Sequence, residues 1–293
     1  MLLSLYLDRA YFIDHSKGFR LSEYYDGLNH NIPWSKLLPK TSNNVAVVDF
    51  QGNKGRVRCV TMFEQLEKFR NSPKHIGFRT NQDCFKDIHM HYESLKPGLL
   101  ARSDTLTLIY NYLFKPVPTF FAVIQHLTDA VRSKDEFNSL ETVCTHIRTG
   151  KIKGGSDPLR QGKKGGFVKW IQTKIIPCAK MVAANNIGMT NNKTKTRFFV
   201  AADNTQALSV FKNGMGVDKD VVDGSSVKGL DNVIHLARSG SSLNKAGILR
   251  MLGDFEVFRR SCDYIVLAPS TFSSVAFVAS FLNVTFQKIK SFY

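Results

Sequence analysis

The chain has 293 residues, of which 43% are hydrophobic and 22% are charged, a composition typical of a soluble globular protein and not of a disordered one. Its formal net charge of +16 favours anionic partners such as nucleotide diphosphates, polyanionic glycans, acidic membranes or nucleic acid. Five cysteines without CxxC spacing argue against zinc and thioredoxin-like chemistry, and no apolar run reaches the ~18 to 20 residues that span a membrane.

The first half of the chain predicts a mixed α/β segment. We expect strands at residues 11–14, 45–50 and 75–79, and helices at 61–69, 105–114 and 119–132. The polar residues 133–136 then read as a linker. We therefore expect two domains, 1–135 and 136–293.

The second half alternates strands and helices. Strands are expected at residues 143–148, 197–202, 233–236 and 263–268, and helices at 167–184, 204–211, 244–260 and 275–282. Pro177 should kink the first of these helices. The helix at 244–260 should turn its apolar side chains inward, namely Ile248, Leu252, Phe255 and Phe258. This alternation predicts an α/β fold with a doubly wound parallel sheet.

The stretch VCTHIRTG, residues 143–150, places chemistry at the end of one strand. Side chains alternate along a strand, so His146 and Arg148 should point to the same side. The carboxyl ends of parallel strands face the ligand crevice of such a sheet, and a guanidinium offers a fork of donors to paired anionic oxygens. The alternative is an Arg at a strand end that extends to water.

Two more predicted strands end in polar groups. Asp203 follows the strand at 197–202, and its carboxylate suits a ribose hydroxyl or a base N–H. Hydroxyls and main-chain N–H groups of residues 270–274, at a helix start, suit an anion. In both places the alternative is helix capping, by Asp203 or Asn204 in the first and by the serines and threonine in the second.

Taken together, VCTHIRTG, FFVAADN and DYIVLAPSTFSS resemble the three motifs of the fucosyltransferase superfamily that groups α1,2- and α1,6-fucosyltransferases with protein O-fucosyltransferases. LYLDRAYFID, followed by NIPW, is similar to the segment that these enzymes carry after their glycine-rich first loop. The resemblance implies a GT-B-like fold of two Rossmann-like lobes. The N-terminal, acceptor-side lobe is expected to be incomplete, because the glycine-rich loop, the first strand and the membrane anchor do not precede this segment.

The implied activity is inverting, metal-independent transfer of fucose from GDP-fucose, the donor substrate, to a glycan or protein hydroxyl. By resemblance, Arg148 grips the β-phosphate beside His146, and Asp203 and Asp254 contact the nucleotide. Asp157 is the first acidic residue after Arg148 and is the candidate base for the acceptor hydroxyl. The last motif contributes phosphate or base contacts through Thr271, Phe272, Ser273 and Ser274. No cofactor or metal is implied, and we expect the D-x-D spacing at 218–220 to lie in a loop.

Three alternatives stay open: a catalytically silent GDP-sugar-binding relative, a transferase of another sugar, and a basic nucleic-acid-binding protein. No recognisable nucleic-acid module supports the last. The resemblance and two glycosylation sequons, at Asn192 and Asn283, favour the Golgi or another secretory lumen. One or two disulfides are open there, although Cys144 and Cys262 lie in apolar runs where buried thiols are the simpler expectation.

Overall fold

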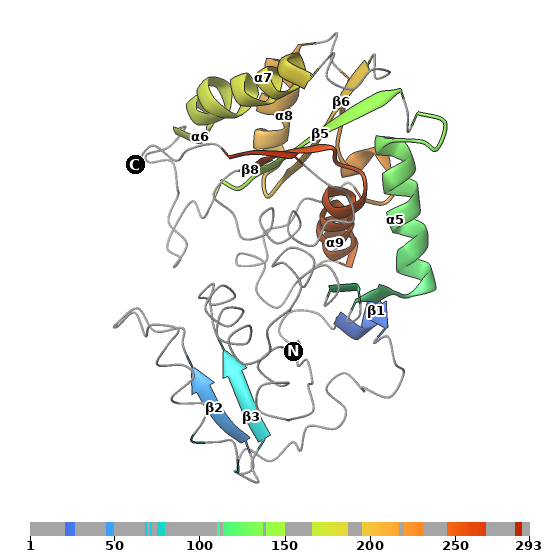
Figure 1. Ribbon diagram of the computed structural model, residues 1–293, viewed down its shortest axis with the longest axis vertical. Helices are drawn as coiled ribbons and strands as arrows, with labels where there is room; N and C mark the ends of the chain where they lie inside the picture. Colours follow the sequence, from blue (N-terminus) through green and yellow to red (C-terminus); the bar gives the residue numbers. More distant parts are fainter. Residues whose placement is uncertain are drawn as a thin grey trace, which may run out of the picture. The chain divides into compact units, whose positions relative to one another are not determined.

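The structure of the chain is a computed structural model (Figure 1). It describes residues 21–26, 45–49, 68, 71, 75–79, 110–111, 114–136, 139–149, 166–186, 195–216, 220–230, 245–267 and 285–288. The chain divides into two compact units, residues 1–15 with 26–115 and residues 16–25 with 116–293. This division differs from the boundary predicted at residue 135.

The second unit is built on a five-stranded parallel sheet with the strand order β7-β6-β5-β8-β9. The strands are β5 (Leu140–Ile147), β6 (Lys195–Ala202), β7 (Asp220–Val222), β8 (Tyr264–Leu267) and β9 (Thr285–Lys288). Numbered along the chain, this is the order 3-2-1-4-5 of a doubly wound, Rossmann-like sheet. The predicted parallel α/β fold is therefore confirmed for this unit.

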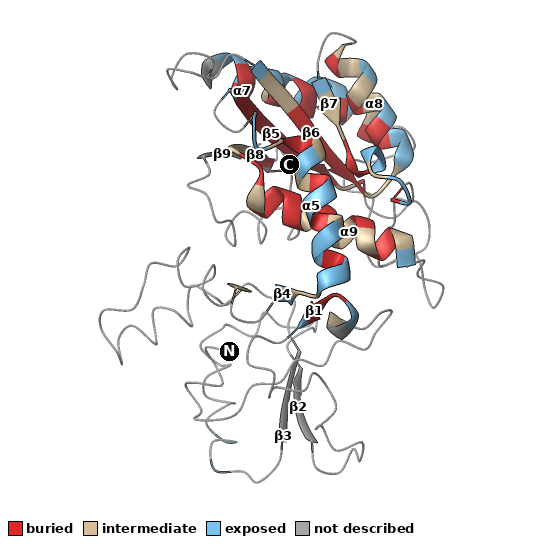
Figure 2. Cartoon of the chain, turned by 90° about the vertical axis from the view of Figure 1, so that its right-hand side faces the viewer, coloured by how far each residue is buried: buried red, intermediate tan, exposed pale blue. Residues whose placement is uncertain are grey.

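Helices cover both faces of this sheet (Figures 1 and 2). Their bounds are α5 Pro118–Val131, α6 Gly166–Trp170, α7 Ile176–Asn186, α8 Thr205–Met215 and α9 Lys245–Arg260. Val143 and Phe198 pack into a core with α6, α7 and α8, whereas their neighbours Cys144 and Phe199 pack into a second core with α5 and α9. All eight residues of β5 are buried, as expected for a strand covered on both faces.

Three short elements complete the unit. The 3-10 helices are η1 Leu21–Glu23 and η4 Gly224–Ser226, and a π-helical turn, η3 Ile171–Ile175, joins α6 to α7. The π-helical turn stands just before Pro177, whose ring and missing N–H disturb the regular hydrogen-bond ladder. The two-residue strands β1 (Tyr25–Asp26) and β4 (Lys115–Pro116) pair with each other in a separate two-stranded sheet.

Helix α9 buries charge as well as apolar surface. Ile248 and Phe258 are buried as predicted, but Leu252 and Phe255 are only partly so. Four charged side chains of α9 are buried instead: Arg250, Asp254, Glu256 and Arg259. Their charges are paired, for Arg250 meets Asp254 and Arg259 meets Glu256. Glu256 also accepts a hydrogen bond from the Tyr25 hydroxyl at 3.1 Å.

A disulfide joins Cys144 of β5 to Cys262, two residues before β8, with their Cα atoms 5.8 Å apart. The expectation of two buried thiols is therefore wrong. The strand pairing explains it, because Cys144 lies opposite Ile265 of β8 and its side chain faces the core that also contains Cys262. Cys178 is a free thiol.

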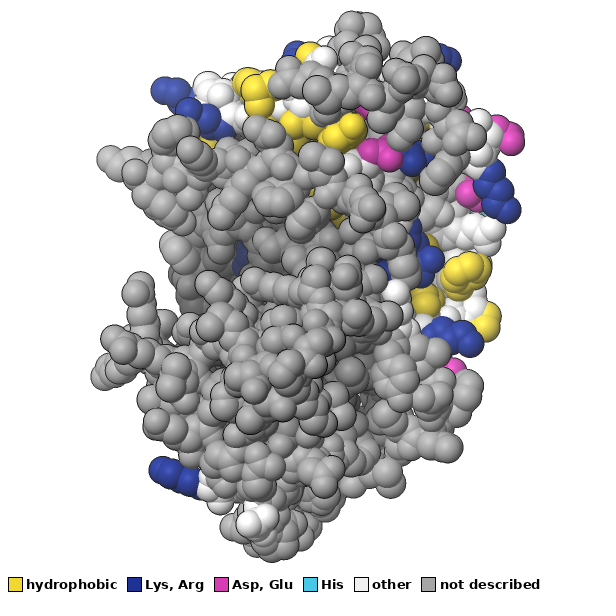
Figure 3. Space-filling model, in the orientation of Figure 1, with side chains coloured by type: hydrophobic (Ala, Val, Ile, Leu, Met, Phe, Trp, Pro, Cys, Tyr) yellow, Lys and Arg dark blue, Asp and Glu magenta, His cyan; other side chains and the backbone are white. Residues whose placement is uncertain are grey.

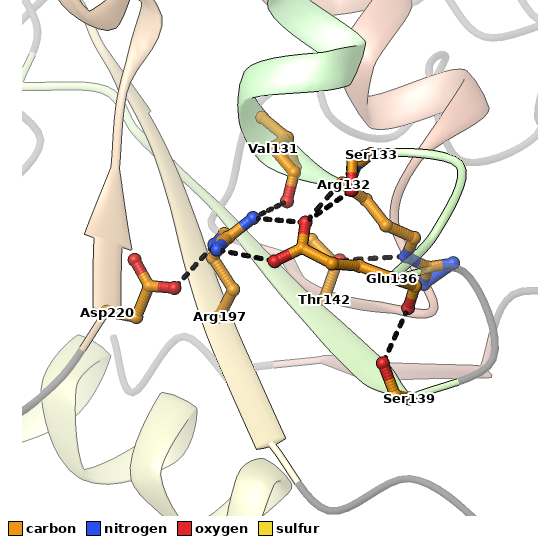
Figure 4. Close-up of polar contacts among 8 residues, drawn as sticks. All are labelled: Val131, Arg132, Ser133, Glu136, Ser139, Thr142, Arg197 and Asp220. Atoms are coloured by element: carbon orange, nitrogen blue, oxygen red, sulfur yellow. Dashed lines mark hydrogen bonds and ion pairs between the residues drawn. The ribbon is translucent and has the colours of Figure 1, made fainter.

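Residues expected to form an interdomain linker lie instead in a polar network at the amino ends of the strands (Figure 4). Glu136 accepts hydrogen bonds from Arg197 of β6 at 3.0 and 3.1 Å, and Arg197 also meets Asp220 of β7 at 2.5 Å. Nearby, Arg132 pairs with Asp263. The network ties the end of α5 to the sheet. Asp220 begins β7, so the loop expected at 218–220 is wrong at that residue.

In the first unit, β2 (Val45–Asp49) and β3 (His75–Arg79) are parallel neighbours, with Val45 opposite His75. Both strands were predicted. The expected strands at 11–14 and 233–236 and the helices at 61–69 and 275–282 lie outside the described residues, apart from a turn at residue 68. The described residues contain one clear Rossmann-like sheet, so the expected pair of Rossmann-like lobes is shown only as a single parallel α/β unit.

Candidate functional site

The central strand β5 ends at the topological switch point of the sheet. From β5 the chain passes through α6 and α7 to β6, and then through α8 to β7, all on one side of β5. β8 follows α9 and pairs with the other side of β5. Connections that leave in opposite directions open a crevice at the carboxyl end of the central strand, where ligands bind in this class of fold. His146 and Arg148 stand at that end of β5.

His146 and Arg148 differ in their surroundings. The imidazole of His146 is buried, 8% exposed, and meets the ring of Phe258 of α9 edge-on with centroids 6.4 Å apart. Arg148 lies one residue beyond the strand and is partly exposed. Arg148 is therefore the more accessible of the two residues, although its Nε atom is buried, whereas the imidazole of His146 packs against the helix layer.

Asp203 holds the segment around Arg148. Its backbone N–H donates to the carbonyl of Ile147 at 3.3 Å. Its Oδ1 accepts hydrogen bonds from the backbone N–H of Thr149 at 2.9 Å and from the Thr149 hydroxyl at 2.8 Å. Asp203 thus contacts both residues that flank Arg148, and one of them, Thr149, was missed by sequence reasoning.

Capping at the start of α8 belongs to Asn204. Its side chain accepts a hydrogen bond from the N–H of Gln206 at 2.8 Å, and its backbone is extended, as at an N-cap. Of the two caps considered from the sequence, Asn204 is confirmed. The Asp203 carboxylate is directed at the end of β5.

Asp254 lies inside the molecule in an ion pair. Its two carboxylate oxygens each accept from Arg250 Nε at 3.0 Å, and burial raises the pKa of Asp254 to about 7 despite that partner. Arg250 also donates to the carbonyl of Leu230 and approaches Asp223, which follows β7, at 3.5 Å. Arg250 thereby links Asp254 to the residue at the carboxyl end of β7.

The other predicted site residues, Asp157 and the set Thr271, Phe272, Ser273 and Ser274, lie outside the described residues. Within the described ranges, no group of three or more His, Cys, Asp and Glu side chains is arranged to hold a metal ion. No helix in those ranges is long and apolar enough to cross a membrane.

Basic side chains are dispersed where the surface is described. Figure 3 shows Lys and Arg, in dark blue, at several separate places on this face, some of them beside acidic groups in magenta. Among the described residues of this face, the positive charge does not form one continuous patch, in line with its even spread along the sequence.

No family model and no curated protein matches the sequence. Several solved structures are similar, and two of them are described here. One is an arginine-to-lysine mutant of Arabidopsis thaliana FUT1 in complex with GDP, with a TM-score of 0.62 and 12% identity over 98% of this chain. The other is NodZ α1,6-fucosyltransferase soaked with GDP-fucose, with a TM-score of 0.50 and 10% identity over 95% of this chain.

The chain spans 66% of the length of the FUT1 structure and 85% of the NodZ structure. At identities this low, the likeness concerns the course of the backbone and not individual side chains. It covers nearly the whole chain, and it agrees with the doubly wound sheet of the second unit. The chain therefore has an α/β fold similar to that of the FUT1 and NodZ fucosyltransferases.

Proposed function

We propose that the chain binds GDP-fucose at the carboxyl edge of its five-stranded sheet and transfers fucose to a glycan or protein hydroxyl. The observation that carries the proposal is the position of Arg148, a partly exposed residue immediately after the central strand of that sheet. The likeness to a FUT1 structure with GDP and a NodZ structure soaked with GDP-fucose supports this choice of ligand.

Arg148 would act on the leaving group. In an inverting transfer, the acceptor hydroxyl attacks the sugar carbon opposite the pyrophosphate, and negative charge grows on the departing phosphate. A guanidinium already oriented toward that phosphate stabilises the charge where it develops. Arg148 and main-chain donors would neutralise the diphosphate, so the proposed route requires no metal ion.

The remaining site residues have proposed roles around that step. His146, packed against α9, would lie beside the diphosphate. Asp254 of α9 would contact the nucleotide. Asp157 would be the base that accepts the acceptor's proton. Thr271, Phe272, Ser273 and Ser274 would complete the phosphate and base contacts. A second, acceptor-side lobe of the GT-B type, containing β2 and β3, belongs to the same proposal.

The proposed compartment is the Golgi or another secretory lumen. The disulfide between Cys144 and Cys262 supports it, because such bonds persist in oxidising compartments and are rare in the cytosol.

Calorimetric titration of the full chain with GDP and GDP-fucose, followed by an assay of donor hydrolysis, tests the proposal. Arg148→Ala should weaken GDP binding by at least about tenfold, since a hydrogen bond to a charged group contributes about 1.5–3 kcal/mol. Lys195→Ala is the matched control. It removes one positive charge from the exposed amino end of β6, and it should leave binding unchanged.

Catalytic silence is the second candidate function. The chain covers 66% of the FUT1 structure at 12% identity, and this likeness of the backbone does not by itself carry turnover. GDP binding without hydrolysis or transfer would favour a silent GDP-sugar-binding protein. No binding of either ligand would remove both candidates.

A further inference from the structure

Arg148 lies between two residues that both form hydrogen bonds with Asp203. On one side of it, the carbonyl of Ile147 accepts from the N–H of Asp203 at 3.3 Å. On the other side, the N–H and the hydroxyl of Thr149 both donate to Asp203 Oδ1, at 2.9 and 2.8 Å. Asp203 therefore holds the backbone of both residues that flank Arg148.

These contacts begin where the sheet stops. The register of β5 and β6 ends with Ile147 opposite Ala202, so the backbone of Arg148 lies beyond the last strand pair. Within β5, the hydrogen bonds to β6 restrain the backbone. Beyond Ile147, the Asp203 carboxylate, bound to two donors of Thr149, restrains it instead. Thr149 is fully buried, which shields these hydrogen bonds from competition by water.

Asp203 is itself restrained on both sides. It directly follows β6, and the next residue, Asn204, caps α8 through its 2.8 Å hydrogen bond from the N–H of Gln206. The Asp203 carboxylate is thus attached at the junction between β6 and α8. A group mounted on such rigid elements can fix the direction of its partner within a fraction of an ångström.

We propose that Asp203 and Thr149 are positioning residues, which aim the guanidinium of Arg148 at the diphosphate of the ligand. This inference rests on the proposed function. It assigns Asp203 a role through Arg148, whereas the resemblance implied a direct contact with the guanosine. It also assigns a role to Thr149, whose hydroxyl supplies one of the two bonds to the carboxylate.

Thr149→Val tests the inference in the full-length chain, because valine keeps the volume and loses the hydroxyl. GDP affinity by calorimetric titration should fall about tenfold, because a misdirected guanidinium loses its own charge-assisted hydrogen bond to the diphosphate. Thr149→Ser keeps the hydroxyl and should restore affinity to within about twofold of wild type.

Thr142→Val is the matched control. Thr142 is equally buried, lies at the opposite end of the same strand, and accepts a hydrogen bond from Arg132 Nε at 3.3 Å. Both valine variants should lower the melting temperature. GDP affinity should fall for Thr149→Val alone, which separates positioning from a general loss of stability.

A double-mutant cycle links the effect to Arg148. In the Arg148→Ala background, Thr149→Val should no longer lower GDP affinity tenfold, because there is no guanidinium to orient. The weak affinities of these variants are measured by ligand-detected NMR. An undiminished effect in that background would overturn the inference, and so would wild-type affinity in Thr149→Val. Both results would leave the proposed function standing, whereas a wild-type chain that does not bind GDP would overturn both.

Discussion

The disulfide between Cys144 and Cys262 makes a quantitative prediction about stability. The two cysteines are 118 residues apart, so the bond closes a long loop in the unfolded chain. The chain-entropy relation for a loop of that length gives about 5 kcal/mol of stabilisation at 25 °C. Both side chains are fully buried and in contact with the core that includes Val257 and Ile265, so the bond also fills apolar space.

We expect the Cys144→Ala/Cys262→Ala variant to lose about 3–5 kcal/mol of unfolding free energy, measured by urea denaturation of the full chain. Cys178→Ala is the control. It removes a free, partly buried thiol and should cost less than about 1 kcal/mol.

Two results would refute this reasoning. The first is a double variant as stable as the control. The second is mass spectrometry of the unreduced protein in which Cys144 and Cys262 both carry an alkylating label. Either would also remove the support that the bond lends to a secretory compartment.

Two further predictions concern α9. A Cβ on Gly253 would overlap the end of the buried Leu127 side chain of α5, so Gly253→Ala should cost about 1–3 kcal/mol in urea unfolding. That loss should shrink in a Leu127→Ala background, and an equal loss there would contradict the close approach. Burial raises the pKa of Asp254 from 3.8 to about 7, so the folded chain binds that proton more tightly than the unfolded chain. Asp254→Asn should therefore gain stability relative to wild type as pH rises from 4 to 7 and level off above, whereas a difference constant from pH 4 to 8 would exclude the shift.

Within the five-stranded sheet, the strands that the sequence predicted are the three inner ones, which are covered on two faces. β6 and β8 contain continuous apolar runs and β5 is rich in β-formers, because both sides of each strand meet a helix layer. β7 and β9 were missed, and they are the two edge strands of the sheet. The first begins with the exposed Asp220 and the second reads TFQK, so neither has the apolar run that identifies a central strand.

The buried face of α9 was predicted only in part, because a periodicity argument assigns charged residues to solvent. Arg250 and Glu256 are buried here with partners from elsewhere in the chain, namely Asp223 after β7 and Tyr25 in β1. Such partners become neighbours only after the chain folds, and no local pattern contains them. The disulfide has the same origin, since it follows from the pairing of β5 with β8.

In the candidate site, too, some features follow from the local sequence and others only from the pairing of strands. The placement of His146 and Arg148 at a strand end follows from one stretch of sequence. The contact of Thr149 with Asp203 joins residues 54 positions apart, and it depends on the register of β5 with β6. One signal was available: Thr149 and Asp203 are short polar residues that each stand just past the apolar run of neighbouring strands.

The central claim is that Arg148 meets the diphosphate of a GDP-sugar, and calorimetric titration of GDP into the wild-type chain and the Arg148→Ala variant tests it most directly. We predict saturable binding to the wild type, at least about tenfold weaker binding to the variant, and wild-type affinity in Lys195→Ala. If the chain is active, donor hydrolysis should fall by about 10²- to 10³-fold in the Arg148→Ala variant. Equal GDP affinities for the wild type and Arg148→Ala would contradict the claim.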